Sequence, residues 1–423
     1  MLEGEGAGTI LQPSVALGGG VVQGVSGSRI VIRDLTIAAV GIAPFGVSLQ
    51  NCTYCVVENL FISGTTQDGV YLSSSQDVDV RSCQMLGCMR NGVAHGSGTP
   101  GLRIRVMGCT LQQCGHYGVD LEPASESAIV NCQAVACSNG GFVITGEADG
   151  PYLHGNRIEN CTATGNGGPG ISLGRSIGCL ISGCVSSQNQ YGIYIGSNCV
   201  GTQVVSNHTI GNAASGIHVF AGADRSVISG NIACENGEYG IATGGNMTTI
   251  TGNLCRGNAT SYYQVRDGIL VATCLGCTIT GNVCIDSVGQ TALTGDASAG
   301  SKTLQVADVR DFYAKQFITV TGATSEDAVV VGTTASPPRL YLLSPLAYSH
   351  TVASGAKAKG RAGQRYGIYL QRESGSGDRH VVTGNVVTGN GTSQILDATL
   401  KSCVSNNILW LEDTDPPSLP ACG

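Results

Sequence analysis

The sequence is poor in charge, in aromatic side chains and in lysine. Only 12% of the 423 residues are charged, 5% are aromatic and one is Trp, and the formal net charge is −7. An acidic chain with so few cations is not expected to bind nucleic acid. The five lysines all follow residue 300, so an anionic ligand of the earlier part would have to be met by arginine.

The sequence also lacks long apolar runs and helical periodicity. No run approaches the roughly 18–20 residues that a membrane-spanning helix needs, and no segment has an apolar stripe with a 3.6-residue period. The start, Met1-Leu2-Glu3-Gly4-Glu5-Gly6, has no signal-peptide pattern. Because it begins inside what looks like a repeat, we consider that a leader or an N-terminal cap has been removed.

Glycine and cysteine, by contrast, are abundant. The 63 Gly have no period of three, which excludes collagen, and 42% hydrophobic residues argue against disorder. Many of the 19 Cys recur with four intervening residues, as in Cys83/Cys88. Zinc sites need paired CxxC motifs, whereas Cys274/Cys277 is a lone CxxC. We therefore predict buried thiols that fill the core, with disulfides or a metal site as alternatives.

Two short phrases recur along the chain. The first ends in Asn, Cys or His, and its copies are 22 to 29 residues apart except for a gap between residues 282 and 385. Its last residues are Asn59, Cys83, Cys109, Cys132, Cys161, Cys184, His208, Asn231, Asn253, Asn282, Asn385 and Asn407. The second phrase is a Gly followed by an apolar residue. Its glycines are Gly46, Gly69, Gly92, Gly118, Gly141, Gly170, Gly192, Gly216, Gly240, Gly268 and Gly367.

Such a repeat predicts a solenoid, because one strand-turn unit cannot bury its apolar residues until the next unit stacks on it. The repeat length favours an all-β chain, a right-handed parallel β-helix with three strands per coil and about 12 coils. Leucine-rich repeats would need a Leu-x-x-Leu-x-Leu pattern that is missing. We expect coils over 1–295 and 363–409, a small inserted β module over 296–362, and a C-terminal cap over 410–423. The insert is either a sugar-binding or oligomerisation module or a simple loop expansion.

One copy of the second phrase, Tyr117-Gly118-Val119-Asp120-Leu121-Glu122-Pro123, differs from the others by carrying two carboxylates. Residues two apart share a face of a strand. If Val119 and Leu121 enter the core, Asp120 and Glu122 therefore point outward side by side. The residue after each Gly-apolar pair should form one outward row. This row comprises Ser48, Tyr71, Ala94, Asp120, Val143, Ser172, Tyr194, His218, Ala242, Leu270 and Tyr369.

The repeat resembles the pectate-lyase-like superfamily of right-handed parallel β-helices, over nearly the whole chain outside the insert. Tyr117-Gly118-Val119-Asp120 is similar to the Tyr-Gly-x-Asp that opens the catalytic motif of mannuronan C5-epimerases and related β-helix alginate lyases. In that family the motif continues through Pro-His and an acidic residue, where Leu121-Glu122-Pro123 stands here. The resemblance implies a carbohydrate-active enzyme with Tyr117, Asp120 and Glu122 at its site. The Gly-His-Gly and Arg-x-Lys phrases of polygalacturonases do not occur, whereas tailspike depolymerases, which share the fold, remain open.

Epimerisation or β-elimination of a uronate needs three groups. A cation neutralises the carboxylate, a base removes the C5 proton, and an acid supplies a proton. The candidates for these roles are Arg105 or Arg175, His116 and Tyr117. No cofactor is required by this chemistry, although Ca²⁺ is a candidate for the neutralising cation.

A glycoside hydrolase is the alternative enzyme. Two carboxylates would flank the glycosidic bond, about 5–5.5 Å or 6.5–9.5 Å apart according to mechanism. The candidate pairs join Asp120 to Glu122, Glu147 or Asp149. The residues predicted to bind substrate are Tyr71, Arg103, Glu147, Asp149, Tyr152, His154, Arg175, Tyr194 and His218. His95 falls at an inward position, so we expect it to be structural.

The sequence therefore predicts a β-helix enzyme acting on an acidic polysaccharide, as a lyase or C5-epimerase. A tailspike-type hydrolase and a non-catalytic glycan-binding or structural β-helix are the alternatives. Such a protein would be extracellular or on a virion or cell surface, without a membrane span or a nucleic-acid partner. A homo-oligomer is compatible with this prediction.

Overall fold

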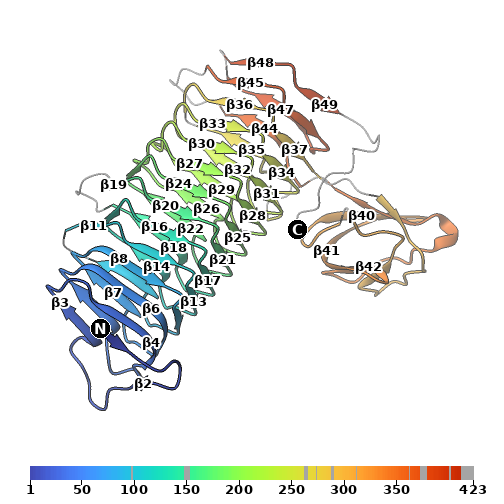
Figure 1. Cartoon of the computed structure of the whole chain (residues 1–423). Coiled ribbons are helices and arrows are strands. Elements are labelled where there is room, and N and C mark those ends of the chain that lie inside the picture. Colours follow the sequence, from blue (N-terminus) through green and yellow to red (C-terminus); the bar gives the residue numbers. More distant parts are fainter. Residues whose placement is uncertain are drawn as a thin grey trace.

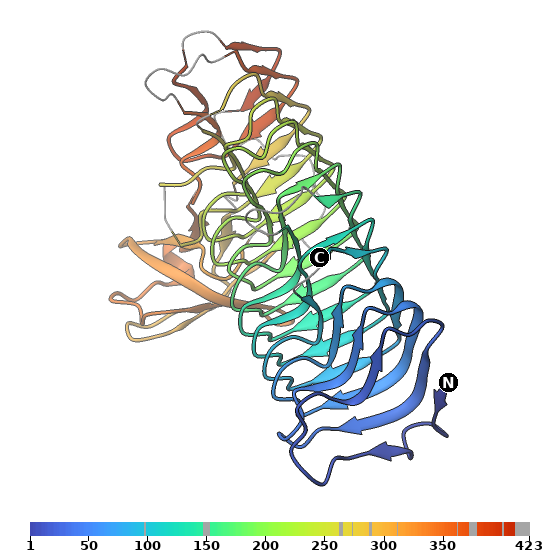
Figure 2. The same ribbon diagram turned by 90° about the vertical axis from the view of Figure 1, so that its left-hand side faces the viewer.

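The chain folds into a parallel β-helix (Figures 1 and 2). The computed structural model describes residues 1–96, 99–146, 153–261, 265–272, 274–286, 290–310, 312–361, 363–371, 379–399 and 402–410. The coils stack into a long rod with the N-terminus at one end, and a small β module projects from its side near the C-terminal coils. The predicted fold class is confirmed.

A coil contributes two to four strands, most often the predicted three, and one of them joins a 13-stranded parallel sheet. This sheet consists of β3 (Gly20–Val25), β5 (Phe45–Gln50), β7 (Val70–Ser73), β10 (Val93–Gly96), β14 (Tyr117–Leu121), β18 (Gly140–Thr145), β22 (Ile171–Gly174), β26 (Ile193–Ile195), β29 (Ile217–Val219), β32 (Ile241–Thr243), β35 (Ile269–Val271), β44 (Tyr366–Leu370) and β47 (Ser393–Asp397). The predicted number of about 12 coils is too low, since this sheet alone contains 13 strands.

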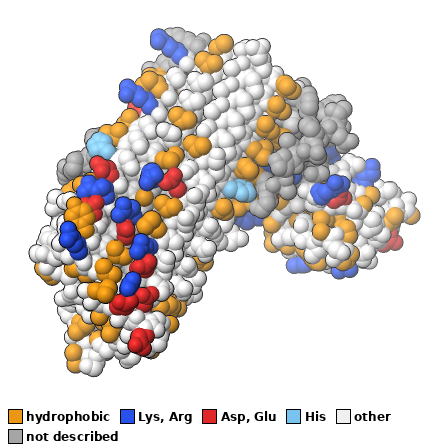
Figure 3. All heavy atoms as spheres, viewed as in Figure 1, with side chains coloured by type: hydrophobic (Ala, Val, Ile, Leu, Met, Phe, Trp, Pro, Cys, Tyr) orange, Lys and Arg blue, Asp and Glu red, His pale blue; other side chains and the backbone are white. Residues whose placement is uncertain are grey.

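The remaining strands of the coils, usually two in each, belong to a 28-stranded sheet. Its strands are β1 (Leu2–Glu3), β2 (Ile10–Leu11), β4 (Val31–Ala38), β6 (Thr53–Ser63), β8 (Gln76–Arg81), β9 (Gln84–Leu86), β11 (Gly101–Leu102), β12 (Arg105–Met107), β13 (Thr110–Gln112), β15 (Ala124–Ser125), β16 (Ala128–Val130), β17 (Gln133–Val135), β20 (Arg157–Glu159), β21 (Thr162–Thr164), β24 (Leu180–Ser182), β25 (Val185–Ser187), β27 (Gln203–Val205), β28 (His208–Ile210), β30 (Val227–Ser229), β31 (Ile232–Cys234), β33 (Thr249–Thr251), β34 (Leu254–Arg256), β36 (Thr278–Thr280), β37 (Val283–Ile285), β45 (Val381–Thr383), β46 (Val386–Thr388), β48 (Cys403–Ser405) and β49 (Ile408–Trp410). Two short corner strands, β19 (Leu153–His154) and β23 (Ser176–Ile177), pair with each other. On the face seen in Figure 3, charged side chains gather over the N-terminal half of the rod.

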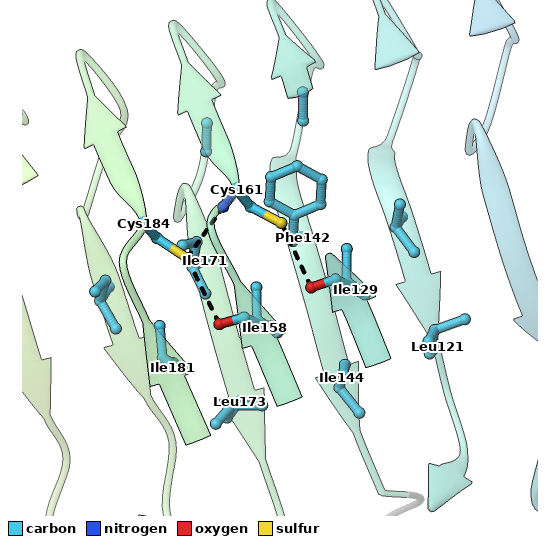
Figure 4. Packing of buried hydrophobic residues seen from close by; sticks show 14 of the residues in the cluster. Leu121, Ile129, Phe142, Ile144, Ile158, Cys161, Ile171, Leu173, Ile181 and Cys184 are labelled. Atoms are coloured by element: carbon cyan, nitrogen blue, oxygen red, sulfur yellow. Dashed lines mark hydrogen bonds between the residues drawn. The ribbon is translucent and has the colours of Figure 1, made fainter. Parts of the chain in front are cut away.

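Alternate residues of each coil point into one continuous core. In β14, Val119 and Leu121 are fully buried, as predicted. Figure 4 shows how side chains of neighbouring coils, among them Phe142 and Ile158, fill the interior. Because the coils repeat, the core extends through the stack rather than forming a single central cluster.

The glycine of the second phrase is required because its backbone touches the core. A Cβ added to Gly118 would lie 2.8 Å from the Cβ of Ala134 and 2.8 Å from the carbonyl oxygen of Gly141 in the next coil. Such contacts are too short for any side chain. Gly118 therefore faces inward like the residue that follows it, and Tyr117 and Asp120 lie on the same outer side of the coil.

Thiols fill buried columns in the N-terminal half, as Cys161 and Cys184 illustrate (Figure 4). The backbone N–H of Cys161 donates to Sγ of Cys184 at 3.4 Å. In later coils asparagine takes the same position, beginning with Asn207 rather than the His208 counted in the repeat. The described cysteines are free and buried except for the exposed Cys403 and the disulfide-bonded Cys234, which confirms the predicted thiol core.

The inserted module is a six-stranded antiparallel sheet with a hydrophobic core of its own. Its strands are β38 (Gln290–Ala292), β39 (Thr303–Gln305), β40 (Phe317–Thr321), β41 (Glu326–Ala335), β42 (Pro338–Leu342) and β43 (Lys357–Gly360), so it begins before the predicted start at residue 296. The hydroxyl of Tyr313 donates to Oδ1 of Asp286 at 3.2 Å and links the module to the coils. Within the described ranges the only helical segment is the 3₁₀ turn η1 (Val352–Ser354), and no helix there could cross a membrane. The predicted cap beyond Trp410 lies outside the described residues.

Candidate functional site

The predicted outward row is a single line of backbone pairing on the 13-stranded sheet. Consecutive pairs join Ser48, Tyr71, Ala94, Asp120, Val143, Ser172, Tyr194, His218, Ala242, Leu270 and Tyr369 in that order. Neighbouring strands lie about 4.8 Å apart. The side chains of the row are therefore aligned along the rod. The predicted members of the row are confirmed.

A cavity of about 180 Å³ lies on this row between Tyr71 and Asp120. Its floor consists of the small residues Ala94 and Gly96, which belong to the coil between them. The ring of Tyr71 stacks on Phe45, with centroids 4.5 Å apart, and its outer edge leans over Gly96. The remaining lining residues are Arg90, His95 and Glu122. The cavity thus exists because a tyrosine and a carboxylate flank a coil with almost no outward side chains.

Asp120 is the buried carboxyl group of this cavity. The residue is only 6% exposed, and its Oδ1 makes no hydrogen bond within the described part of the chain. Burial, and then the neighbouring charge of Glu122, raise the pKa of Asp120 to about 7, against the opposing effect of Arg90. A carboxyl group with this pKa can take up or release a proton near neutral pH.

Tyr117 and His116 stand beside Asp120 at the start of the same coil. Their rings meet edge to face with centroids 4.4 Å apart, and Nε2 of His116 lies 2.8 Å from the side-chain nitrogen of Asn139. Burial, followed by the charges of Asp120 and Glu122, raises the pKa of Tyr117. The phenol therefore keeps its proton near neutral pH and can act as a proton donor.

Arg90 is the cation of the cavity, and it was missed in the sequence. Its side chain is 52% exposed, and Nη1 lies 4.0 Å from Oδ2 of the fully buried Asp68. Burial and then the charge of Arg90 lower the pKa of His116, whose backbone N–H donates to the carbonyl oxygen of Arg90 at 2.7 Å. A signal was present, because Arg90 stands two residues before Gly92 just as His116 stands two residues before Gly118.

Arg103 and Arg105 lie elsewhere. Arg105 belongs to β12 of the 28-stranded sheet, where its Nε contacts Asp79 at 2.5 Å. Arg103 donates two hydrogen bonds to Asp77, at 2.6 and 2.8 Å. Each arginine is thus paired with an acid of the preceding coil. The structure does not bring Arg105 to Asp120, because the chain turns a corner into the other sheet between β10 and β12.

The other predicted residues divide into three groups. Tyr71 and His95 both line the cavity, but His95 is only 1% exposed, and burial lowers its pKa to about 4. His154, exposed at the end of β19, and Arg175, after β22, lie at the corners that leave the 13-stranded sheet one and two coils beyond Asp120. The residues Glu147, Asp149 and Tyr152 lie outside the described residues.

Tyr194 and His218 belong to an aromatic cluster further along the row. Their rings are stacked, with centroids 5.6 Å apart and an interplanar angle of 10°. Tyr191 and the 46% exposed Phe220 contact both rings. Three pairings separate Tyr194 from Asp120, or about 14 Å at the usual strand spacing. Partly exposed flat rings in line with the cavity are suited to stack against the faces of sugar rings.

Comparisons with known proteins agree with this architecture. The model of the NosD family, described as periplasmic copper-binding protein, matches residues 101–232 and 168–306. No curated protein matches the sequence. The A-module of mannuronan C-5 epimerase AlgE4 from Azotobacter vinelandii is 12% identical, with a TM-score of 0.52 over 94% of this chain and 88% of its own. The chain has the fold of the mannuronan C5-epimerases.

Two further solved structures extend this comparison. The A-module of epimerase AlgE6 from the same organism is 12% identical, with a TM-score of 0.50 over 92% of each chain. The Dettilon tailspike protein is also 12% identical, with a TM-score of 0.44 over 78% of this chain and 87% of its own. At 12% identity a likeness shows the fold alone, and the expected relation to the parallel β-helix proteins is confirmed.

The side chains do not form a metal site in the part of the chain that the structure describes. No group of three or more His, Cys, Asp or Glu there is placed to hold an ion. In the cavity, the carboxyl groups of Asp120 and Glu122 are accompanied by Arg90.

Proposed function

We propose that the chain acts on an acidic polysaccharide, as a lyase or C5-epimerase of a uronate polymer. The proposal rests on one observation: Asp120, with a pKa of about 7, lines the same cavity as Arg90. A base tuned to neutral pH beside a fixed cation is suited to remove a proton next to a carboxylate. The epimerase names of two structural neighbours support this substrate class.

In the proposed reaction, a uronate places its carboxylate on the guanidinium of Arg90. The ion pair withdraws charge from C5 and makes the C5 hydrogen more acidic. Ionised Asp120 then removes this proton, and the protonated Tyr117 donates its own. In a lyase the C4–O bond breaks, C4 and C5 form a double bond, and the leaving oxygen takes the Tyr117 proton. In an epimerase that proton goes to the opposite face of C5.

The neighbouring residues support these two groups. The charge of Glu122 helps to keep the pKa of Asp120 near 7, so that the carboxylate is a stronger base than a solvated one. The edge contact from His116 holds the ring of Tyr117. Tyr71 and the aromatic cluster around Tyr194 bind sugar units on either side of the reacting one.

A glycoside hydrolase is the second candidate, because Asp120 and Glu122 are two carboxyl groups at one cavity. Asp120, whose pKa is raised, would protonate the glycosidic oxygen, and the exposed Glu122 would act as nucleophile or base. A glycan-binding protein without catalysis is the third. It would use the aromatic cluster and leave the carboxyl groups without a chemical role.

The proposed polysaccharide substrate favours a setting outside the cytoplasm. We therefore propose an extracellular, surface or periplasmic setting, and the family description of NosD as periplasmic supports this proposal.

The experiment is a turnover assay on polymannuronate, polyguluronate and polygalacturonate. Ultraviolet absorbance from an unsaturated product identifies a lyase, and proton NMR of the polymer identifies an epimerase. Asp120→Asn and Tyr117→Phe should each reduce kcat/KM by about 10²-fold or more, whereas Arg105→Ala on the other sheet should leave it unchanged. New reducing ends without absorbance would establish the hydrolase instead. Binding of a polymer without turnover would support the third candidate, a glycan-binding protein without catalysis.

A further inference from the structure

Two cysteines outside the candidate site touch each other. The Sγ atoms of Cys274 and Cys277 are 3.3 Å apart at the corner between β35 and β36. The two residues are 4% and 0% exposed, whereas Leu275 and Gly276 between them are exposed. The pair therefore lies directly beneath a surface turn.

The same two corner positions occur in neighbouring coils with other side chains. There the second residue usually bonds the first, since Thr248 donates to the carbonyl oxygen of Gly245 at 2.8 Å and Ser226 to that of Ala223 at 3.2 Å. The equivalent pairs Ser176/Cys179 and Cys199/Thr202 hold one thiol each. Among these corners only the one at Cys274 has cysteine at both positions, so the repeat geometry itself brings the two sulfurs into contact.

The two thiols differ in their surroundings. The backbone N–H of Cys277 donates to Nδ1 of His380 at 3.2 Å, from the next coil. The hydrogen bond with Cys274, and less strongly the contact with His380, lower the pKa of Cys277 to about 6. The interaction with Cys277, followed by burial, raises the pKa of Cys274. Because His380 lies beside Cys277, the sulfur of Cys277 is the readier nucleophile, and Cys274 is its proton donor.

We propose that Cys274 and Cys277 form a dithiol site that reduces low-molecular-weight disulfides and closes to an intramolecular disulfide. The thiolate of Cys277 attacks one sulfur of the external disulfide and releases a thiolate, which leaves a mixed disulfide. The sulfur of Cys274 then attacks Cys277 and releases the second thiolate. The two thiol protons pass to the two released thiolates, so one external disulfide is reduced for each bond formed. This site does not depend on the proposed polysaccharide chemistry.

A metal ion is a poorer occupant of this corner. No third Cys, Asp, Glu or His completes a ligand group around the two sulfurs in the described ranges. A disulfide, in contrast, needs only these two atoms and a small approach from 3.3 Å. It would brace the coil from which the inserted module departs, next to the Cys277–His380 hydrogen bond that spans the insertion.

The test equilibrates the folded full-length protein in glutathione redox buffers, quenches it with acid and labels the remaining thiols with a maleimide. Mass spectrometry of peptides should show loss of two hydrogens from the peptide that carries Cys274 and Cys277. Cys179 and Cys199, the single thiols at equivalent corners, should remain labelled. If all four cysteines stay as thiols in oxidising buffer while circular dichroism shows a folded chain, the proposal is overturned.

Two variants test the proposed order of attack, in which Cys277 reacts first and Cys274 second. Cys274→Ser should leave Cys277 as a stable mixed disulfide with glutathione, because the resolving sulfur is absent. Cys277→Ser should leave Cys274 unmodified under the same buffer. Equal glutathione adducts on both variants, or on Cys179 in the parent protein, would show ordinary thiol reactivity and would overturn the dithiol site.

Discussion

Cys184 and Asn207 occupy the same position in consecutive coils, and the backbone N–H of Cys184 donates to Oδ1 of Asn207 at 2.9 Å. From Cys83 to Cys184 the column consists of thiols, and from Asn207 onward it consists of carboxamides. The amide of Asn231, for example, accepts the N–H of Asn207 at 2.9 Å and donates to the carbonyl oxygen of Val204 at 2.8 Å. Sulfur is a weak acceptor, so the asparagine half of the column satisfies the backbone better than the cysteine half.

Asn231→Ala should therefore destabilise the C-terminal coils strongly. It leaves the N–H of Asn207 buried without a partner and removes one of the hydrogen bonds to the carbonyl oxygen of Val204. A buried donor without a partner costs about 1–3 kcal/mol, and the smaller side chain also leaves a cavity in the core. We expect a loss of about 2–5 kcal/mol in the free energy of unfolding. Because a solenoid can open locally, hydrogen exchange at residues 204–207 is the more direct measurement, and it should accelerate there first.

Cys161→Ala is the matched control in the thiol half of the column. It removes one small buried group and a contact of 3.5 Å between Sγ and the carbonyl oxygen of Ile129. Weak acceptance by sulfur predicts a smaller cost, about 1–2 kcal/mol. Equal losses from Asn231→Ala and Cys161→Ala would contradict the unequal roles of the two halves.

The outward row could be predicted because periodicity sets it. Once a Gly-apolar phrase recurs at coil spacing, the parallel stack aligns each following residue, and Tyr71, Asp120 and Tyr194 fall on one line. The inward pair Val119 and Leu121 follows from strand alternation for the same reason. These relations are local in each coil, and the repeat carries them along the rod.

The cavity could be predicted only in part, because it depends on corners and on the lean of a ring. Arg90 lies in the turn before β10, and outside a strand the alternation of side chains between the two faces cannot predict where a side chain points. Arg105 stands nine residues after Gly96, yet a corner places it on the other sheet. The hollow itself needs Tyr71 to lean over Gly96, a tertiary contact that composition does not specify.

Asp120→Asn should stabilise the protein above pH 7. The pKa of Asp120 is about 7 in the folded chain and about 3.9 in the unfolded chain. Below pH about 4 both states hold the proton. As pH rises toward 7 the unfolded state loses its proton first, which removes up to about 4 kcal/mol of stability. The asparagine side chain of the variant does not ionise, so the variant does not lose this stability. The difference in melting temperature between the Asp120→Asn variant and the parent protein should therefore be larger at pH 8 than at pH 5.

Asp77→Asn is the control, because the pKa of Asp77 is lowered whereas that of Asp120 is raised. The hydrogen bond from Arg103 lowers the pKa of Asp77, so its charged form stabilises the fold at neutral pH and this stabilisation is lost as pH falls through the folded pKa. The substitution should lower the melting temperature at pH 8 and matter less at acidic pH. An Asp120→Asn shift that is the same at both pH values would contradict the raised pKa.

Glu122→Gln should move the pH dependence of turnover. In the proposed mechanism Asp120 acts in its ionised form, so kcat/KM rises as pH passes through its pKa. Burial is the larger cause of the raised pKa and the charge of Glu122 the next. Removing that charge should move the acid limb of the pH profile of kcat/KM toward lower pH. The movement should be only part of the whole rise in the pKa of Asp120, because burial remains. An unchanged limb would exclude Asp120 as the titrating base, and a shift toward higher pH would do the same.

Arg90→Ala should reduce kcat/KM on a uronate polymer by about 10²-fold or more, the usual effect of removing a group that stabilises developing charge. Arg90→Lys should recover part of the loss, since it keeps the charge beside the buried Asp68. Arg105→Ala tests the cation on the other sheet and should have little effect. Melting temperatures of all three variants separate a chemical loss from unfolding, and full activity of Arg90→Ala would contradict its role.

Tyr194→Ala should weaken the binding of long substrates without changing the chemical step. The ring is stacked on His218 about three coils from Asp120, or about 14 Å away, so only oligosaccharides that reach it can use it. An aromatic contact of about 1 kcal/mol predicts a KM about five times higher for polymer, with kcat unchanged and short fragments unaffected. Tyr54→Ala removes a 63% exposed tyrosine from the 28-stranded sheet and should change neither constant. Equal effects on short and long substrates would place Tyr194 outside the binding groove.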